Sequence, residues 1–308
     1  MQINFDIQQY IIPFITDQDV APNSRTTYQN ALHQFSFWIV NNNITKLTRD
    51  IILRYKFWLD TRSLSSFTKA IYLVVIKKFF QWTEEQNLYK NIAHGIKSAK
   101  RSTRNHQKDS LSAEGVKKVL HCIDRGSLQG KRDYALINML IRTGLRLREI
   151  ASASINDMQQ EGDSTLLWIR GKGRHGKDEF VMLTQETLNS LHDYLLCRKI
   201  ESEQEPLFAS VSDRNFGKLL TTFSLSRIIR NRLIASGLKT KRITAHSLRH
   251  TFGVLAMKAG ASLYEVQLAM RHAAPTTTQL YLGDIERLKR LEAAPEKKIS
   301  ALLQEQGL

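Results

Sequence analysis

Apolar residues recur at helical spacing through most of the first hundred positions. One series starts at Ser24, which we expect to cap its helix, and a second can start at Thr48. A third begins near Ser66 and runs to Trp82. No alternating pattern competes with them, so this region is predicted to be all-α. The residues expected to face inward are Tyr28, Ala31, Leu32, Phe35, Trp38 and Ile39, then Ile51, Ile52, Tyr55, Trp58 and Leu59, then Ile71, Val74, Val75, Phe79 and Trp82.

The periodicity stops between residues 95 and 109, where the chain reads GIKSAKRSTRNHQKD. A stretch without apolar spacing between two periodic regions is typical of a linker. We therefore expect a helical domain over residues 1–96, a linker over 97–110 and a second domain over 111–308. The linker either is no more than soluble chain or follows a polyanion with its cations, which are Lys97, Lys100, Arg101, Arg104 and Lys108.

Helical patterns also open the second domain. Ser112 is the expected N-cap of its first helix, with Glu114 in the first turn, where a carboxylate favours the helix dipole. The stretch KRDYALINMLIRTGLRLREIASAS then predicts a buried helix that is capped by Asp133, broken at Gly144 and continued from Leu145.

A β-hairpin interrupts these helices. Two β-rich runs, residues 165–169 and 179–183, flank a glycine-rich turn. The fold class is therefore expected to be mainly α with a small antiparallel β-sheet.

The charge balance indicates the kind of partner. Lysine and arginine number 45 against 29 aspartate and glutamate, which gives a formal net charge of +16 and a pI near 9.9. Such a field favours a polyanion, with nucleic acid as the first candidate and an anionic membrane as the second. No run of about 18 apolar residues is present, and the first residues lack a basic stretch followed by an apolar block. We therefore expect neither a membrane partner nor a secretory signal.

The two cysteines, Cys122 and Cys197, lie far apart in apolar helical contexts. They are interpreted as small core residues, with a disulfide as the alternative, which indicates a reducing cytoplasm.

The candidate chemistry is concentrated in a short segment near the end of the chain. His246, Arg249, His272 and Tyr281 lie within it. A phenol can attack a phosphorus atom while imidazoles handle protons and a guanidinium stabilises the phosphate oxygens. Because the pKa of tyrosine is near 10, only about one phenol in a thousand is ionised at pH 7. A neighbouring group must therefore accept the proton or stabilise the phenolate.

Two further cations belong to this hypothesis. Arg146 follows the predicted helix break, and a guanidinium beside a helix start suits a bound phosphate. Taken alone, it would be a surface arginine paired with Glu149. Lys172 stands between Gly171 and Gly173 near the hairpin tip, where it can donate a proton into a groove or be only an exposed turn residue.

Four motifs in order, TGLRLRE, the GKG hairpin, HSLRHTF and RHAAPTTTQLY, resemble the signature boxes of the tyrosine site-specific recombinases, or phage-integrase family, at an Xer-like chain length. They cover most of residues 111–285, whereas residues 1–100 match only by their helical, basic layout. The resemblance implies an all-α core-binding domain and an α+β catalytic domain of tyrosine recombinase type. It further implies a site-specific DNA recombinase that works through a Holliday junction without metal, ATP or another cofactor.

The resemblance also implies a role for each matched residue. Tyr281 would form a 3′-phosphotyrosyl bond, and Arg146 and Arg249 would clamp the scissile phosphate. Lys172 would protonate the departing 5′-oxygen, and His246 would accept the proton of the tyrosine.

His272 would hydrogen-bond the phosphate, while His250 fits the motif but is interpreted as structural. The sequence departs from the family pattern in two places. Arg148 stands where a small residue such as serine is usual, and Met270 and Arg271 stand where Leu-Gly usually precedes the histidine. Arg271 adds a bulky cation beside His272 and makes the role of that histidine the least secure.

The end of the chain is amphipathic, with Ile299, Leu302 and Leu303 at i, i+3 and i+4. This helix, at about residues 296–308, either packs on its own domain or, as in the family, docks into a neighbouring subunit with Pro295 as the hinge. The implied partners are double-stranded DNA with inverted-repeat core sites and a homotetramer in the synapse, from a protein that is a monomer or dimer when free. We expect it to act on the nucleoid in the cytoplasm.

Two other classes use the same features. A type IB topoisomerase would relax DNA of any sequence as a monomer, and a non-catalytic regulator would only bind DNA. Integration, excision, inversion and dimer resolution all remain open as the biological role.

Overall fold

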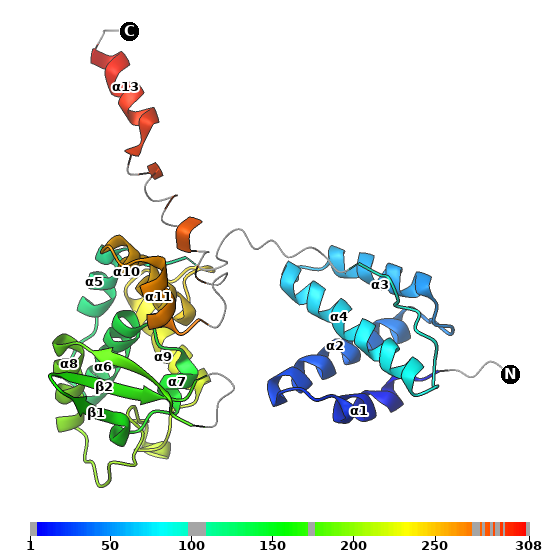
Figure 1. The fold of residues 1–308 in the computed structure, drawn as a ribbon, viewed down its shortest axis with the longest axis horizontal. Coiled ribbons are helices and arrows are strands. Elements are labelled where there is room, and N and C mark those ends of the chain that lie inside the picture. Colours follow the sequence, from blue (N-terminus) through cyan, green and yellow to red (C-terminus); the bar gives the residue numbers. More distant parts are fainter. Residues whose placement is uncertain are drawn as a thin grey trace. The chain divides into compact units, whose positions relative to one another are not determined.

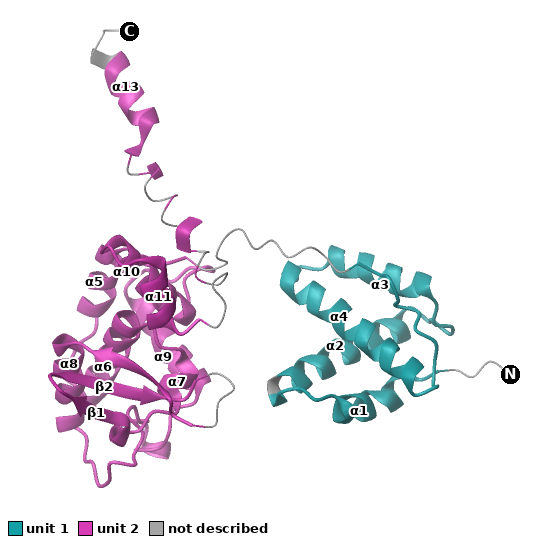
Figure 2. Cartoon of the chain, viewed as in Figure 1, with its two compact units in different colours: residues 1–103 teal, residues 104–308 magenta. Residues whose placement is uncertain are grey.

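The computed structural model describes residues 5–97, 109–171, 176–272, 278, 281–283, 286, 290–291 and 293–305. The chain divides into two units, residues 1–103 (unit 1) and 104–308 (unit 2), coloured separately in Figure 2. The fold is mainly helical with a three-stranded antiparallel sheet, which confirms the predicted fold class. None of the helices described in these ranges is long and apolar enough to cross a membrane.

Unit 1 is helical throughout its described elements, α1 (Ile7–Asp17), α2 (Pro22–Asn41), α3 (Arg49–Thr61) and α4 (Ser66–Glu85) (Figure 1). The starts of α3 and α4 agree with the sequence. The predicted cap at Ser24 is wrong, because proline has a backbone angle that suits a first helical turn and α2 begins at Pro22.

Aromatic rings fill the core between these helices. Phe35 meets Tyr55 edge to face at 4.8 Å between ring centroids, and Phe14 meets Phe79 at 5.4 Å. Trp38 and Trp82 are buried, and Trp58 packs half-buried against the same core. The tryptophans are therefore core residues of unit 1.

Unit 2 is organised around α6 (Leu128–Thr143), which packs against α8 (Gln185–Leu196) and α10 (Ala245–Lys258). Buried side chains from Ala135 to Leu140 place α6 inside the core. The other helices with described bounds are α5 (Ala113–His121), α7 (Leu147–Ala151), α9 (Thr222–Ala235), α11 (Leu263–Met270) and α13 (Pro295–Glu305), with 3-10 turns at Ile155–Asp157 and Asp213–Asn215.

The sheet has the order β1 (Met158–Glu161), β2 (Ser164–Ile169) and β3 (Glu179–Leu183). The predicted hairpin matches β2 and β3, with Leu167 opposite Val181. The sequence did not indicate β1, whose residues MQQE lack apolar alternation. Main-chain pairing with β2 forms this strand without a side-chain signal.

Asp133 does not cap α6, contrary to the prediction. The cap is Ser127, whose hydroxyl accepts from the backbone N–H of Gly130 at 3.1 Å. Asp133 lies one and a half turns further on, buried between two guanidinium groups, with contacts of 2.6 Å to both Arg132 and Arg232. Asp133 therefore neutralises arginine charge inside the fold instead of capping a helix.

Cys122 and Cys197 are both exposed free thiols, so their interpretation as core residues is wrong. Each is the C-cap residue that follows its helix, α5 or α8, rather than a residue on the buried face of that helix.

Replacing Asp133 by asparagine should lower the free energy of unfolding by about 3 kcal/mol, because it leaves buried arginine charge without its counter-ion. Urea unfolding followed by circular dichroism measures the change. Glu114→Gln is the control, since its ion pair with Lys117 is exposed on both sides. Equal, negligible effects for the two variants would contradict the assignment of Asp133 to a stabilising buried pair.

Candidate active site

Arg146 is delivered by the sharp turn at the end of α6. Gly144 adopts a left-handed conformation with φ of 62°, and a Cβ there would lie 2.5 Å from the ring of Phe252 on α10. Glycine is therefore required both for the turn and for the close approach of the two helices. Two residues later, Arg146 is the N-cap of α7.

The side chain of Arg146 is held mainly by Glu149. Its Nη1 lies 2.6 Å from Oε1 of Glu149, and its backbone N–H donates to Oε2 at 2.7 Å. Its Nη2 donates to the carbonyl of Arg271 at 3.1 Å. The ion pair between Arg146 and Glu149 that the sequence suggested is thus present. The carboxylate of Glu149 also accepts from the backbone N–H of Arg146 at the start of α7. The group of Arg146 that can contact a phosphate is its guanidinium, because the side chain is 30% exposed.

Arg249 is buried in the first half of α10. Its Nη1 donates to the carbonyl of Gly144 and its Nη2 to that of Met270. Burial, reinforced by the positive charge of Arg146, lowers the pKa of Arg249 to about 10, so the group remains charged at neutral pH. The two arginines therefore donate to consecutive carbonyls, those of Met270 and Arg271, at the end of α11.

Tyr281 packs its ring directly on the backbone of α10. A Cβ at Gly253 would lie 2.8 Å from Cε1 of this ring, so the contact depends on glycine. The rings of His250 and His272 lie 5.0 Å and 6.3 Å away between centroids. Tyr281 is buried in this contact, with 3% of its surface exposed.

The histidines differ in their surroundings. Nδ1 of His272 lies 2.8 Å from the hydroxyl of Thr278. His250 is buried against Tyr281, and His246 is exposed in the first turn of α10, one turn before Arg249.

Several predicted residues fall outside the part of the chain that the structure describes. One is Lys172, which follows β2 in the sequence and precedes β3. The others belong to the predicted linker and are Lys100, Arg101, Arg104 and Lys108. Lys97 is described and exposed, and its carbonyl accepts a hydrogen bond from Nζ of Lys56 at 2.8 Å.

Arg271 is a residue of this site whose position the sequence did not predict. Its Nη2 lies 2.9 Å from Oε2 of Glu149 and its Nε 3.6 Å from Oε2 of Glu179, with the side chain 7% exposed. Burial alone would raise the pKa of Glu149, but Arg271 and Arg146 hold it below 4.5. The only signal in the sequence was the departure from Leu-Gly before His272.

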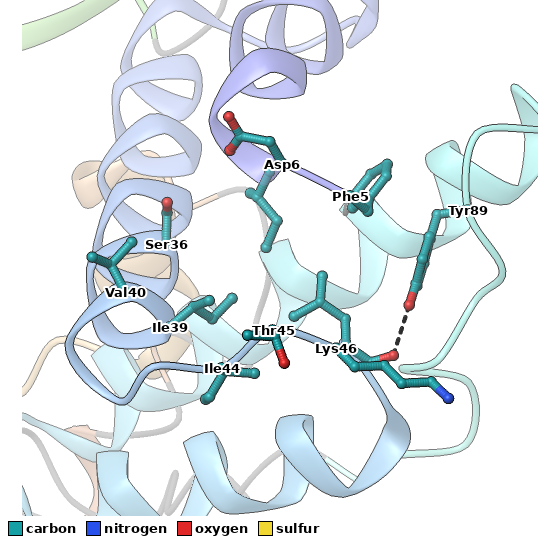
Figure 3. Close-up of a pocket in the computed structure, with 11 residues that line it drawn as sticks. Phe5, Asp6, Ser36, Ile39, Val40, Ile44, Thr45, Lys46 and Tyr89 are labelled. Atoms are coloured by element: carbon teal, nitrogen blue, oxygen red, sulfur yellow. Dashed lines mark hydrogen bonds between the residues drawn. The ribbon is translucent and has the colours of Figure 1, made fainter. Parts of the chain in front are cut away.

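A separate pocket of about 660 Å³ lies within unit 1, and Figure 3 shows its lining. Phe5, Ile39 and Val40 give it apolar walls, and the hydroxyl of Tyr89 donates to the carbonyl of Leu47 at 2.7 Å beside it. Its lining holds one cation, Lys46, so it lacks the grouped cations that a phosphodiester reaction needs.

The family model of the phage integrase family matches residues 109–286, which span the arginines and the tyrosine described above. The chain belongs to this family. It is a tyrosine recombinase, and its activity is site-specific DNA recombination by the tyrosine recombinase mechanism.

Two similar proteins match most of the length of this recombinase. It is 24% identical over 289 residues to tyrosine recombinase XerD of Vibrio cholerae, covering 92% of this chain and 94% of that protein. It is 30% identical over 253 residues to XerH of Campylobacter jejuni, covering 78% and 68%.

Solved structures share the fold. A XerH recombinase bound to palindromic difH substrate aligns with a TM-score of 0.74 at 22% identity, covering 94% of this chain and 84% of that chain. A lambda integrase dimer bound to a COC′ core site aligns with a TM-score of 0.66 at 16% identity, covering 89% and 75%.

Glu149→Gln should lower the free energy of unfolding by about 3 kcal/mol near neutral pH, because buried guanidinium groups lose their shared counter-ion. The folded-state pKa of Glu149 lies below the usual 4.5, so its stabilisation is present above that value and is lost as pH falls through the folded pKa. Urea midpoints near pH 7 and at about pH 3 should therefore show a gap between wild type and variant that narrows in acid. Glu161→Gln, at an exposed position of β1, should leave no such gap. A gap for Glu149→Gln that is independent of pH would contradict this account.

Proposed function

We propose that this recombinase cleaves and rejoins DNA through a 3′-phosphotyrosyl bond to Tyr281 and exchanges strands through a Holliday junction. The observation that supports it most is the grouping at the end of α11. Arg146 and Arg249 donate to neighbouring carbonyls there, and the ring of Tyr281 packs on Gly253 of α10, the helix that carries Arg249.

In this proposal the two arginines bind the non-bridging oxygens of the scissile phosphate. Negative charge on these oxygens increases as the phenol attacks, and each well-placed donor can contribute about 3 kcal/mol to the transition state. The attacking oxygen has to come within about 3–3.5 Å of phosphorus. Since Tyr281 is 3% exposed, we infer that its phenol turns toward the DNA on binding.

The proton transfers complete the step. His246 accepts the phenolic proton as the bond between oxygen and phosphorus forms, and Lys172 protonates the departing 5′-oxygen as its bond to phosphorus breaks. His272 donates a hydrogen bond to the phosphate. The phosphodiester energy stays in the tyrosyl bond, and a second 5′-hydroxyl reverses the reaction to join the new strand.

Both domains and the linker between them would bind the DNA. Residues 1–96 are proposed as the core-binding domain, residues 97–110 as a basic linker along the backbone, and residues 111–308 as the catalytic domain. The net charge of +16 suits this contact with phosphates. The substrate would be an inverted-repeat core site on nucleoid DNA in the cytoplasm, bound by monomers or dimers that assemble into a tetramer.

A nicked suicide duplex, selected from a pool of random inverted repeats by binding to the protein, should become covalently attached to wild-type protein. Tyr281→Phe should give no adduct, and Arg146→Ala and Arg249→Ala should lower its rate at least about a hundredfold. Denaturing gel electrophoresis of labelled DNA measures the adduct. All three variants should still bind the duplex.

An adduct formed by Tyr281→Phe would show that the nucleophile is another residue. No adduct with wild type, together with unchanged biological activity of both arginine variants, would assign a binding function instead. Relaxation of a plasmid that lacks the selected site would favour topoisomerase activity.

The C-terminal helix α13 is proposed to dock into a neighbouring subunit. Its apolar residues Ile299, Leu302 and Leu303 are exposed, at 58%, 56% and 46%. An amphipathic helix of this kind gains stability when another surface covers its apolar face.

Leu302→Glu should therefore weaken assembly of four subunits on two duplexes by about tenfold or more, since it places a charge in an apolar contact. Binding to a single half-site should not change. Native gel electrophoresis separates these complexes, and Lys297→Glu on the opposite side of α13 is the control. Equal tetramer formation by Leu302→Glu and wild type would exclude this docking.

A further inference from the structure

Arg271 occupies a backbone position that disfavours it. It is the C-cap of α11 in the left-handed conformation, with φ of 53° and ψ of 51°. Helices commonly end with glycine in this conformation, because a side chain there is crowded by the backbone. A large cation at such a position indicates that its side chain provides a compensating interaction.

The side chain of Arg271 connects three elements of unit 2. From the end of α11 it reaches Glu149 on α7 at 2.9 Å and Glu179, the first residue of β3, at 3.6 Å. Its Nη1 also donates to the carbonyl of Ala269 at 2.6 Å. The guanidinium therefore lies between two carboxylates and is hydrogen-bonded to Glu149 and to its own helix end.

Glu149 is shared between two arginines in a defined way. Oε1 contacts Nη1 of Arg146 at 2.6 Å, and Oε2 contacts Nη2 of Arg271 at 2.9 Å. The carboxylate is 4% exposed, so little water is available to balance its charge. If Arg271 were absent, Glu149 would lose one of its two arginine contacts, and more of its negative charge would act on Arg146.

We infer that Arg271 is a positioning residue for the strand-cleavage reaction. It neutralises part of the charge of Glu149 and so keeps Arg146 in an orientation that leaves its exposed edge for the scissile phosphate. Its backbone carbonyl supports the same orientation by accepting from Nη2 of Arg146 at 3.1 Å. This inference rests on the proposed contact between Arg146 and the phosphate.

The test uses Arg271→Gly, which suits the left-handed backbone and removes the whole side chain, including the guanidinium. Single-turnover adduct formation on the selected suicide duplex, at saturating protein, should slow by about tenfold or more. The reason is that misplacing a group that binds the reacting phosphate, here Arg146, can lower the rate by up to ~100-fold. DNA affinity should stay within about twofold of wild type, since the loss concerns one phosphate among many.

A double variant separates this role from a merely structural one. In Arg271→Gly/Glu149→Gln the unbalanced carboxylate is also removed, so cleavage should be faster than in Arg271→Gly alone. If Arg271 had only a structural role, the two substitutions would lower the cleavage rate additively, and the double variant would be slower than Arg271→Gly. Asn43→Gly in unit 1, another residue with positive φ, is the control for the backbone effect of glycine and should cleave at the wild-type rate.

The inference would be overturned, with the proposed function intact, if Arg271→Gly cleaved at the wild-type rate. It would also be overturned if the double variant cleaved more slowly than Arg271→Gly. Absence of an adduct with wild-type protein would overturn both.

Discussion

The constraint on which this site depends is the packing of like charges in a small volume. Burial lowers the pKa of Arg249, and the nearby positive charges of Arg146 and Arg271 lower it further. Two carboxylates, from Glu149 and Glu179, and the carbonyls at the end of α11 offset this repulsion. The C-terminal end of a helix carries partial negative charge, which suits bound cations. The balance leaves a net positive site, which suits the proposed contact with an anionic phosphate.

The fold holds these charges by joining segments that are distant in the chain. Gly144 lets α6 turn against α10, and the carbonyl of this glycine accepts from Arg249 across 105 residues of sequence. Gly253 in turn lets the ring of Tyr281 lie on α10. Because α6 is buried in the core of unit 2, the turn that carries Arg146 starts from a rigid element. The two glycines thus allow the segments that carry Arg146 and Tyr281 to pack closely against α10, the helix that carries Arg249.

Much of this could be predicted from the sequence. Helical spacing predicted α3 and α4, β-rich runs around a glycine-rich turn predicted β2 and β3, and the hydroxyl of Ser112 caps α5 as expected. Short-range signals failed where tertiary contacts compete with them. Asp133 has the chemistry of a helix cap but is buried in an ion pair with Arg232, 99 residues away. The polar strand β1 forms by pairing with β2, and no apolar alternation in its own sequence indicates it.

The sequence by itself determined the fold class, the positive charge and the reactive residue types near the end of the chain, because periodicity, composition and motif order are local or additive properties. Only the tertiary structure decided which charges meet. Glu149 could pair with Arg146 from their spacing in one helical turn, but its second partner, Arg271, lies 122 residues further along the chain. Contacts at such separations depend on how α7, α11 and β3 pack, and no local pattern in the sequence records that packing.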